Sequence, residues 1–319
     1  MESINLVPST TFSKRAGARF TRWLRRAAKN WQCYVLILPA VAAVFIFHYI
    51  PIYGVQIAFK DFKASLGFWG SPWVGVEHFR RFLTYPDFWK ILKNTALISL
   101  YSLATVPCPV ILAILLNEVD NPIFKKAVQM ITYIPHFIST VVICSMVLLF
   151  LNRDHGLFNN IIAALGGQRV DFITIPGYFR TIYVWSGVWS GIGWGAIIYF
   201  AALSNISPEL VEAARIDGAS RFQIVRHINI PSILPTIVTM LILNTGQILS
   251  VGFEKIYLLQ NSLNLETSRV ISTYVYEIGL QGGQFSYSTA IGLFNNAVNI
   301  LIIILVNQLS KRLTSIGLW

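Results

Sequence analysis

The sequence predicts an all-α membrane protein that crosses the bilayer six times. Of its 319 residues, 55% are hydrophobic and only 12% are charged, whereas soluble domains average about 25% charged residues. The apolar residues also gather in six nearly uncharged blocks, and a helix needs about 20 apolar residues to cross a bilayer. The spans predicted from these blocks are 33–57, 95–116, 127–150, 182–203, 232–253 and 286–309.

Residues 1–30 are predicted to form a basic arm in the cytoplasm. The basic residues that precede the first span are Lys14, Arg15, Arg19, Arg22, Arg25, Arg26 and Lys29. Such clusters stay on the cytoplasmic side, so six spans place both termini there. The apolar stretch that follows is too long for a secretory signal and lacks a clear small-residue cleavage site. The net charge of +11 could indicate nucleic-acid binding. The basic cluster, however, lies beside an apolar span, which argues against such a partner.

The remaining chain, 31–319, is predicted to be one transmembrane domain with an external cap at about 58–94. The cap segment mixes tryptophan and tyrosine with charges, a composition typical of short helices at the membrane interface. Pro107 and Pro109 should kink the second span, and Pro135 the third, because proline removes a helical hydrogen bond.

The cytoplasmic segment 204–231 interrupts the apolar pattern with a charged run, "ELVEAARIDGASRFQIVRHINIP". Ser207 and Pro208 are typical of the first residues of a helix. Gly218 suits the left-handed position at which a helix ends. The segment therefore begins with a short helix that is too polar to span a membrane.

A second short helix is expected after Gly218. Ser220 and Gln223 have the spacing of a capping box, and this helix should end before Pro231. The first helix presents acids beside a small apolar face, which can dock into a groove on another protein. A helix lying on lipid and a plain connector are the alternatives.

Part of this segment resembles the EAA loop of binding-protein-dependent ABC importer permeases. Glu212-Ala213-Ala214, then Gly218, then Ile228-x-Ile230-Pro231 follow the pattern E-A-A-x3-G-x9-I-x-L-P, with Ile230 in place of leucine. The stretches "FHYIPIYGVQIAFKDFK" (47–63) and "YIPHFIST" (133–140) are similar to sugar-type permeases. The similarity covers about 33–312 and favours the subfamily that imports oligosaccharides or polysaccharides, including the alginate type.

This resemblance implies a type I ABC importer permease, a multi-pass protein of the bacterial cytoplasmic membrane. Its partners would be membrane lipid, a second homologous permease, two ATP-binding subunits and an external solute-binding protein that delivers an oligo- or polysaccharide. The EAA loop would be a coupling helix in a cleft of the ATPase, with Glu212 as the polar contact. The residues expected to couple to that subunit are Glu212, Ala213, Ala214, Arg215, Asp217 and Gly218.

The chain is not expected to be an enzyme. It contains no G-x4-G-K-[ST] phosphate loop and no H-E-x-x-H motif, and its three cysteines have no metal-ligand spacing. No catalytic residue, metal or cofactor is predicted, and ATP and Mg would bind the partner ATPase. An ion-coupled secondary transporter usually needs an ionisable residue within a span, and the last three predicted spans contain none. A permease for another small solute stays open as an alternative.

Polar and aromatic residues in the last three spans are the candidates for a sugar pathway. Asn244 and Gln247 lie one turn apart on the fifth predicted span, with Glu254 on the same face further out. Amides need partners in lipid, so they should face the protein interior, although bonding between helices is the alternative. The predicted pathway residues are Asn244, Gln247, Asn295, Asn296, Asn299, Trp189 and Trp194.

Overall fold

The computed structural model describes residues 29–246 and 248–318, so most of the predicted basic arm and Gln247 lie outside the described residues. Contacts between residues divide the chain into two units, 1–56 and 57–319. Apart from an isolated bridge between Lys60 and Trp73, the described residues are helical or irregular. Among the described residues, five helices are long and apolar enough to cross a membrane, or six if a bent pair is counted as one span. The predicted all-α membrane fold is confirmed.

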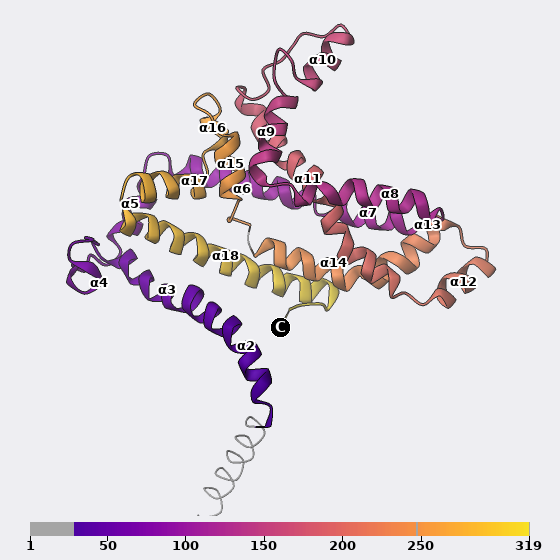
Figure 1. The fold of residues 1–319 in the computed structure, drawn as a ribbon, viewed down its shortest axis with the longest axis horizontal. Coiled ribbons are helices and arrows are strands. Elements are labelled where there is room, and N and C mark those ends of the chain that lie inside the picture. Colours follow the sequence, from indigo (N-terminus) through magenta and orange to yellow (C-terminus); the bar gives the residue numbers. More distant parts are fainter. Residues whose placement is uncertain (1–28, 247, 319) are drawn as a thin grey trace, which may run out of the picture. The chain divides into compact units, whose positions relative to one another are not determined.

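The first unit contains the first apolar helix. It comprises α2 (Trp31–Val44), a π-helical turn (Phe45–Tyr49) and α3 (Ile50–Ile52), shown in indigo in Figure 1. The stretch Trp31–Phe59 is long and apolar enough to cross a membrane, which agrees with the predicted span 33–57. None of the residues of α2 is buried, and a helix that is apolar on every side is typical of contact with lipid.

In the second unit, the second and third spans are interrupted near their prolines. Helices α6 (Phe88–Ala104) and α7 (Pro107–Asn117) meet at the turn before Pro107, where the predicted kink lies. The third predicted span instead divides into α8 (Pro122–Tyr133), a 3-10 turn (Ile134–Phe137) and α9 (Thr140–Phe150). These two arms are bent by 107°. The prediction of one kinked helix over 127–150 was wrong, because the chain around Pro135 breaks rather than bends.

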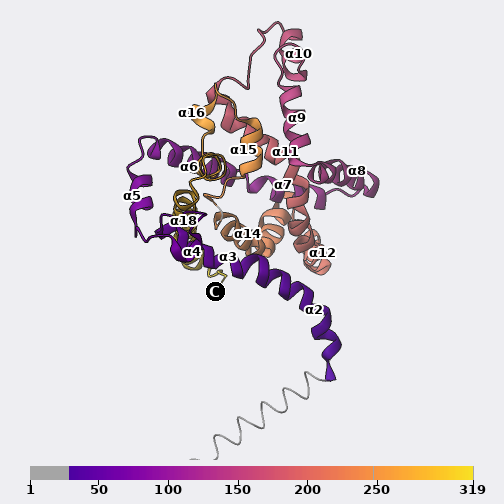
Figure 2. The same cartoon turned by 60° about the vertical axis from the view of Figure 1, so that its left-hand side comes forward.

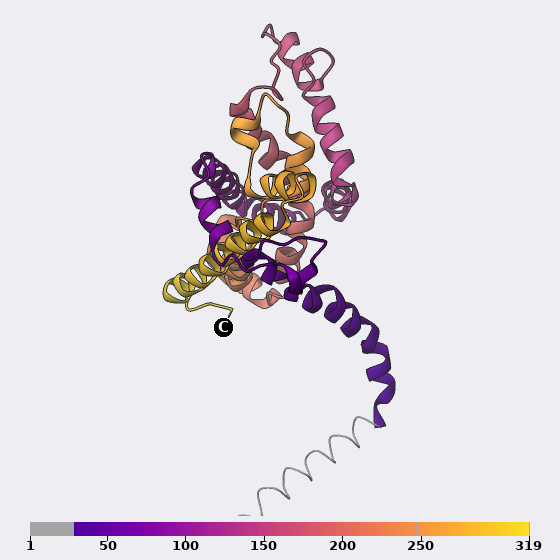
Figure 3. The same cartoon turned by 90° about the vertical axis from the view of Figure 1, so that its left-hand side faces the viewer.

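The fourth span is α11 (Pro176–Ser204), the central helix of the second unit. It packs against α7, α8 and α14 (Ile230–Thr245), and Figure 1 shows α7 and α8 beside it. The apolar core shared by α7, α11 and α14 consists of Val110, Ala113, Ala196, Tyr199, Leu203 and Ile233. The α9–α10 arm, which ends in α10 (Leu157–Ala164), extends away from this core in Figures 1 and 3.

The fifth span begins in segment 204–231 and continues without a break through Pro231. Helix α13 (Arg221–Ile224), a π-helical turn (Val225–Asn229) and α14 together form one span-length helix, Arg221–Thr245. The prediction that the second short helix ends before Pro231 was therefore wrong, because the helix continues into α14. The wide π turn shifts the hydrogen-bond register just before Pro231, and a proline in the first turn after that shift needs no N–H partner.

The same span ends earlier than predicted. Helix α14 stops at Thr245, and α15 (Phe253–Leu259) starts after an irregular stretch. Asn299, from α18 (Phe285–Thr314), supports this break: its Oδ1 accepts from the Leu249 N–H at 3.0 Å, and its Nδ2 donates to Ser250 Oγ at 3.0 Å. Irregular backbone at membrane depth requires such partners. Glu254 thus belongs to a different helix from Asn244, contrary to the single-helix prediction.

Short helices cover the end of the second unit at which α6, α11 and α18 begin. They are α4 (Gly67–Gly70) and α5 (Glu77–Leu83) in the segment predicted as a cap, and α15, α16 (Leu265–Ser268) and α17 (Ile271–Tyr276) after the fifth span. Both α15 and α16 contact α11, and Figures 1 and 2 place them close to it. A buried cluster joins α5, α6, α17 and α18: Phe82, Phe88, Ile91, Ile271, Tyr274, Tyr287 and Ile291.

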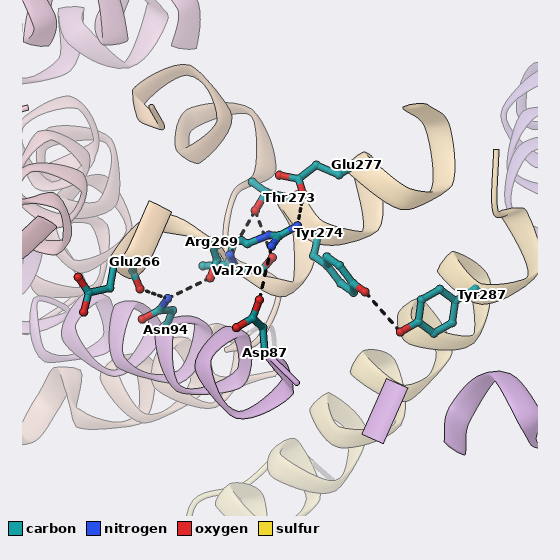
Figure 4. Close-up of polar contacts among 9 residues, drawn as sticks. All are labelled: Asp87, Asn94, Glu266, Arg269, Val270, Thr273, Tyr274, Glu277 and Tyr287. Carbon is teal, nitrogen blue, oxygen red and sulfur yellow. Dashed lines mark hydrogen bonds and ion pairs between the residues drawn. The ribbon is translucent and has the colours of Figure 1, made fainter. Parts of the chain in front are cut away.

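A polar cluster fixes these short helices to α6 (Figure 4). The Arg269 guanidinium pairs with Glu277 at 2.6 Å and lies 3.8 Å from a carboxylate oxygen of Asp87. Asn94, which is 2% exposed, donates to the carbonyl oxygens of Glu266 and Arg269 at 2.8 and 3.2 Å. The segment between α15 and α17 is therefore held against α6 by several satisfied bonds.

Candidate functional site

The first candidate site is α12 (Pro208–Ile216), which starts after Ser207 as predicted. The Ser207 side chain makes no capping hydrogen bond. At the other end, the Ala219 N–H bonds the Ala214 carbonyl at 2.9 Å, and the Gly218 N–H bonds the Arg215 carbonyl at 3.1 Å. This pair of bonds is a Schellman motif, which needs a left-handed residue. Gly218 has φ +81°, which confirms the predicted left-handed position at the end of this helix.

A second cap follows directly and locks the turn after Gly218. The Gln223 N–H bonds Ser220 Oγ at 3.4 Å, and the Ser220 N–H bonds Gln223 Oε1 at 2.7 Å, so the predicted capping box is confirmed. Helix α12 ends at Ile216, and Asp217 is its C-cap. Three residues, Gly218 to Ser220, then connect it to the helix that begins at Arg221 and continues into α14. The turn is fixed at both sides, and α12 is held at a defined angle to the fifth span.

The base of this turn is also tied to the segment after α7. Arg221 forms an ion pair with Asp120 at 2.9 Å and bonds the Glu118 carbonyl at 3.3 Å. This pair is exposed, and such pairs contribute little energy. Asn229, which is 2% exposed, donates to Glu118 Oε1 at 3.2 Å. The end of the second span and the start of the fifth are therefore linked beside α12.

None of the residues of α12 is buried in this chain. The six predicted coupling residues lie together on this helix and its C-terminal turn; Ala214 is half-buried and the other five are exposed. Beside them, Leu210, Ile216 and Phe222 are 57%, 87% and 71% exposed. The helix thus presents acids and large apolar side chains together on an uncovered surface.

The second candidate site is a cavity of about 650 Å³ between α6, α7, α11, α14 and α15, here called the central cavity. Its polar and aromatic lining includes Ser102, Thr105, Tyr183, Ser190, Trp194, Asn244 and Lys255. A smaller cavity of about 200 Å³ shares Ser102, Tyr183 and Asn244 with it and extends toward the break after α14. Asn244 lies where the two cavities meet.

The other predicted pathway residues are not all brought together. Trp194 lines the central cavity and stacks on His136 with ring centroids 4.5 Å apart. Trp189 lines a separate, apolar pocket that includes Phe150 and Leu157.

The asparagine stripe on α18 does not line either cavity. Asn295 has a buried Oδ1 without a hydrogen-bond partner, Asn296 is exposed, and Asn299 bonds the break after α14. Gln247 lies outside the described residues. Among the predicted polar pathway residues that the structure describes, Asn244 is therefore the one that lines the cavities.

Lys255 is a cavity residue that sequence reasoning missed. Its Nζ donates to the Tyr183 carbonyl at 2.7 Å and lies 4.8 Å from the centre of the Tyr183 ring. It lies beyond the span-length helix, and burial lowers the pKa of its amine to about 8. A single helix through 253 would have placed Glu254 on the face of Asn244. The break after Thr245 reorients α15, so Lys255 reaches the cavity instead.

Comparison with known proteins decides the family. The model of the binding-protein-dependent transport system inner membrane component matches residues 90–315, which include α12 and every helix that lines the central cavity. The chain belongs to this family. The permease is also similar to the polygalacturonan/rhamnogalacturonan transport system permease protein YteP of Bacillus subtilis (strain 168), with 44% identity over 299 residues, 93% of each chain.

Other relatives agree with this assignment. The arabinooligosaccharides transport system permease protein AraP of Bacillus subtilis (strain 168) is 30% identical over 98% of the permease and 96% of its own length. A chain of a bacterial alginate ABC transporter, crystallised with an alginate pentasaccharide-bound periplasmic protein, superposes with a TM-score of 0.84 at 40% identity. The match covers 93% of the permease and all of that chain. The permease is a bacterial inner-membrane subunit of a sugar ABC importer.

Proposed function

We propose that the permease moves oligo- or polysaccharides through the central cavity and is driven by ATP hydrolysis in partner subunits docked on α12. The observation that carries this proposal is the position of Asn244, a cavity-lining amide on the same continuous helix whose inner end follows α12. The names of the relatives, which include polygalacturonan and alginate transport, support an oligo- or polysaccharide substrate.

The proposed complex contains a second, homologous permease, two ATPases that bind ATP and Mg, and an external binding protein. Both termini of the permease would lie in the cytoplasm, on the side of α12. Closure of the ATPases on ATP would move α12 and switch the cavity from inward- to outward-facing. The cleft of an ATPase would cover Leu210, Ile216 and Glu212, which are exposed in this chain alone.

The helix Arg221–Thr245 supports transmission over this distance. Its 25 residues rise about 37 Å at 1.5 Å per residue. The Schellman motif and the capping box fix its inner end to α12. A displacement of α12 should therefore reach Asn244, because a capped turn and one continuous helix join them.

Replacement of Asn244 by leucine tests the pathway. Loss of a hydrogen bond to a neutral sugar hydroxyl costs about 0.5–1.5 kcal/mol, so Asn244→Leu should lower import at limiting sugar by up to about tenfold. Basal ATP hydrolysis should stay near the level of the unmodified complex. Import is measured in proteoliposomes that contain both permeases, the ATPases and the binding protein.

Cysteine labelling tests the same proposal independently. A cysteine at position 244, in a background without Cys33, Cys108 and Cys144, should react with a water-soluble thiol reagent, and substrate should protect it. If it stays unreactive in every nucleotide state, the amide serves only contacts between helices and the cavity is not the sugar path.

Gly218→Val tests the fixed angle of α12. A β-branched residue resists the φ of +81°, and the left-handed conformation costs L-residues about 1–2 kcal/mol. We expect the Schellman turn to rearrange, and sugar-stimulated ATP hydrolysis to fall severalfold while the permease still inserts. Gly292→Ala is the control, because beyond its chain neighbours and its own helical turn no atom lies within 4 Å of the added carbon, and Gly292 lines neither cavity. Full stimulation in Gly218→Val would show that the angle of α12 does not matter.

A further inference from the structure

We propose that Lys255 is a carboxylate-binding point in the central cavity, and that the permease carries acidic, uronate-containing glycans past it. This inference rests on the proposed function, because it takes the cavity as the path of the sugar. It assigns the recognition of charge to the permease itself, in addition to any selection that the external binding protein makes.

The Lys255 amine has N–H donors that its bond to Tyr183 does not use. An ammonium group has three N–H donors, and one is used on the Tyr183 carbonyl at 2.7 Å. The ring of the same tyrosine supports the charge from 4.8 Å. Among the described residues, no carboxylate lies within ion-pair distance of this amine. Two donors thus remain for a ligand.

Glycine at position 187 leaves the amine accessible. Gly187 also lines the central cavity, and a Cβ added there would lie 3.1 Å from Lys255 Nζ. Any other residue at this position would put a side chain against the amine. The ammonium group of Lys255 therefore faces an open space beside α11, because Gly187 has no side chain to fill it.

The surroundings of Lys255 favour an anion over a neutral ligand. The titratable groups that influence it or its neighbours are Cys144 on α9, Tyr183 on α11 and the adjacent, exposed Glu254. Burial lowers the pKa of the amine to about 8, which leaves it mostly charged at neutral pH. A partly desolvated cation without a carboxylate partner attracts one from a ligand.

The rest of the cavity fits the other parts of a uronate. Asn244 and Ser190 can bond sugar hydroxyls, and the exposed face of Trp194 can stack on a sugar ring. A lysine within the same cavity adds one carboxylate-binding point to these neutral contacts. A chain of hexuronic residues offers all three groups at once, whereas a neutral glycan leaves the ammonium without a ligand.

The experiment compares an acidic glycan with its neutral counterpart. The probes are a galacturonate oligosaccharide and its carboxyl-reduced form, which has the same hydroxyls without the charge. Import by the complete transporter in proteoliposomes is measured for the unmodified permease, Lys255→Gln and Lys255→Arg. Lys90→Gln is the matched control, because Lys90 is an exposed lysine of α6 outside the cavity lining.

Lys255→Gln should lower import of the acidic glycan at limiting concentration by about ten- to hundredfold and leave the neutral form unchanged. Lys255→Arg should retain most of the acidic import, and Lys90→Gln all of it. An equal loss for both glycans in Lys255→Gln would mean that the lysine only holds α15 to α11, and no loss would mean that it does not meet the substrate. Either result overturns the proposal.

Direct binding to the purified complex, without the external binding protein, removes the selectivity of that protein from the comparison. The unmodified complex should bind the acidic oligosaccharide more tightly than the carboxyl-reduced form, and Lys255→Gln should abolish that difference. The same affinity for both forms in the unmodified complex overturns the proposal. If the unmodified transporter imports neither glycan, the proposed function itself fails, which is distinct from a failure confined to Lys255.

Discussion

Glu212→Lys is expected to abolish coupled sugar import while the permease still inserts in the membrane. Glu212 is exposed on α12, next to the exposed Ala213 and three residues from Arg215. Charge reversal there removes an acid from the surface proposed to meet the ATPase and adds a second cation near Arg215. Disruption of a buried charged contact at an interface costs about 2–5 kcal/mol, which weakens docking by roughly 30-fold or more.

Three measurements test this result together: co-purification of the ATPase subunits, ATP hydrolysis stimulated by the sugar-loaded binding protein, and import. All three should fall in Glu212→Lys. Asp154→Lys is the matched control, since it makes the same charge reversal at an exposed acid between α9 and α10, away from α12. Unchanged import by Glu212→Lys would exclude α12 as the coupling helix.

Gly193→Ala is expected to prevent α11 from packing against α8. A Cβ at this position would lie 2.3 Å from the Thr132 carbonyl oxygen and 2.4 Å from its carbon. These are backbone atoms, so no rotamer change relieves the clash and the two helices must separate. Small residues permit such close approach between membrane helices, and overpacking typically costs about 1–3 kcal/mol or more.

Gly191→Ala, two residues earlier on the same helix, is the control for Gly193→Ala. Beyond its chain neighbours and its own helical turn, no atom lies within 4 Å of the added carbon. Alanine also favours a helix over glycine by about 0.5–1 kcal/mol. Heat-induced loss of the monodisperse complex in detergent should occur at a clearly lower temperature for Gly193→Ala and not for Gly191→Ala. Equal midpoints would show that the two helices tolerate separation.

Features set by neighbouring residues could be predicted from the sequence. The left-handed Gly218 and the Ser220–Gln223 capping box follow from backbone rules that act over a few residues, and the structure confirms both. The apolar blocks likewise predict the spans, because hydrophobic length alone decides whether a helix can cross a bilayer.

Features set by distant residues could not be predicted. The end of α14 at Thr245 depends on a bond from Asn299, which is 50 residues away from Leu249. Lys255 was missed for the same reason, because it reaches the cavity only once the helix has broken. The bend of 107° in the third predicted span could not be predicted from the sequence either. Pro135 predicts an interruption of the helix, but not how the two arms pack on α11.

The amide of Asn299 has a consequence for how motion spreads through the second unit. Its oxygen accepts from the Leu249 N–H and its nitrogen donates to Ser250 Oγ, both in the stretch after α14. Leu249 is only 5% exposed. Sliding of α14 past α18 would strand a buried N–H, which costs about 1–3 kcal/mol. The end of α14 and α18 should therefore move together as one rigid body.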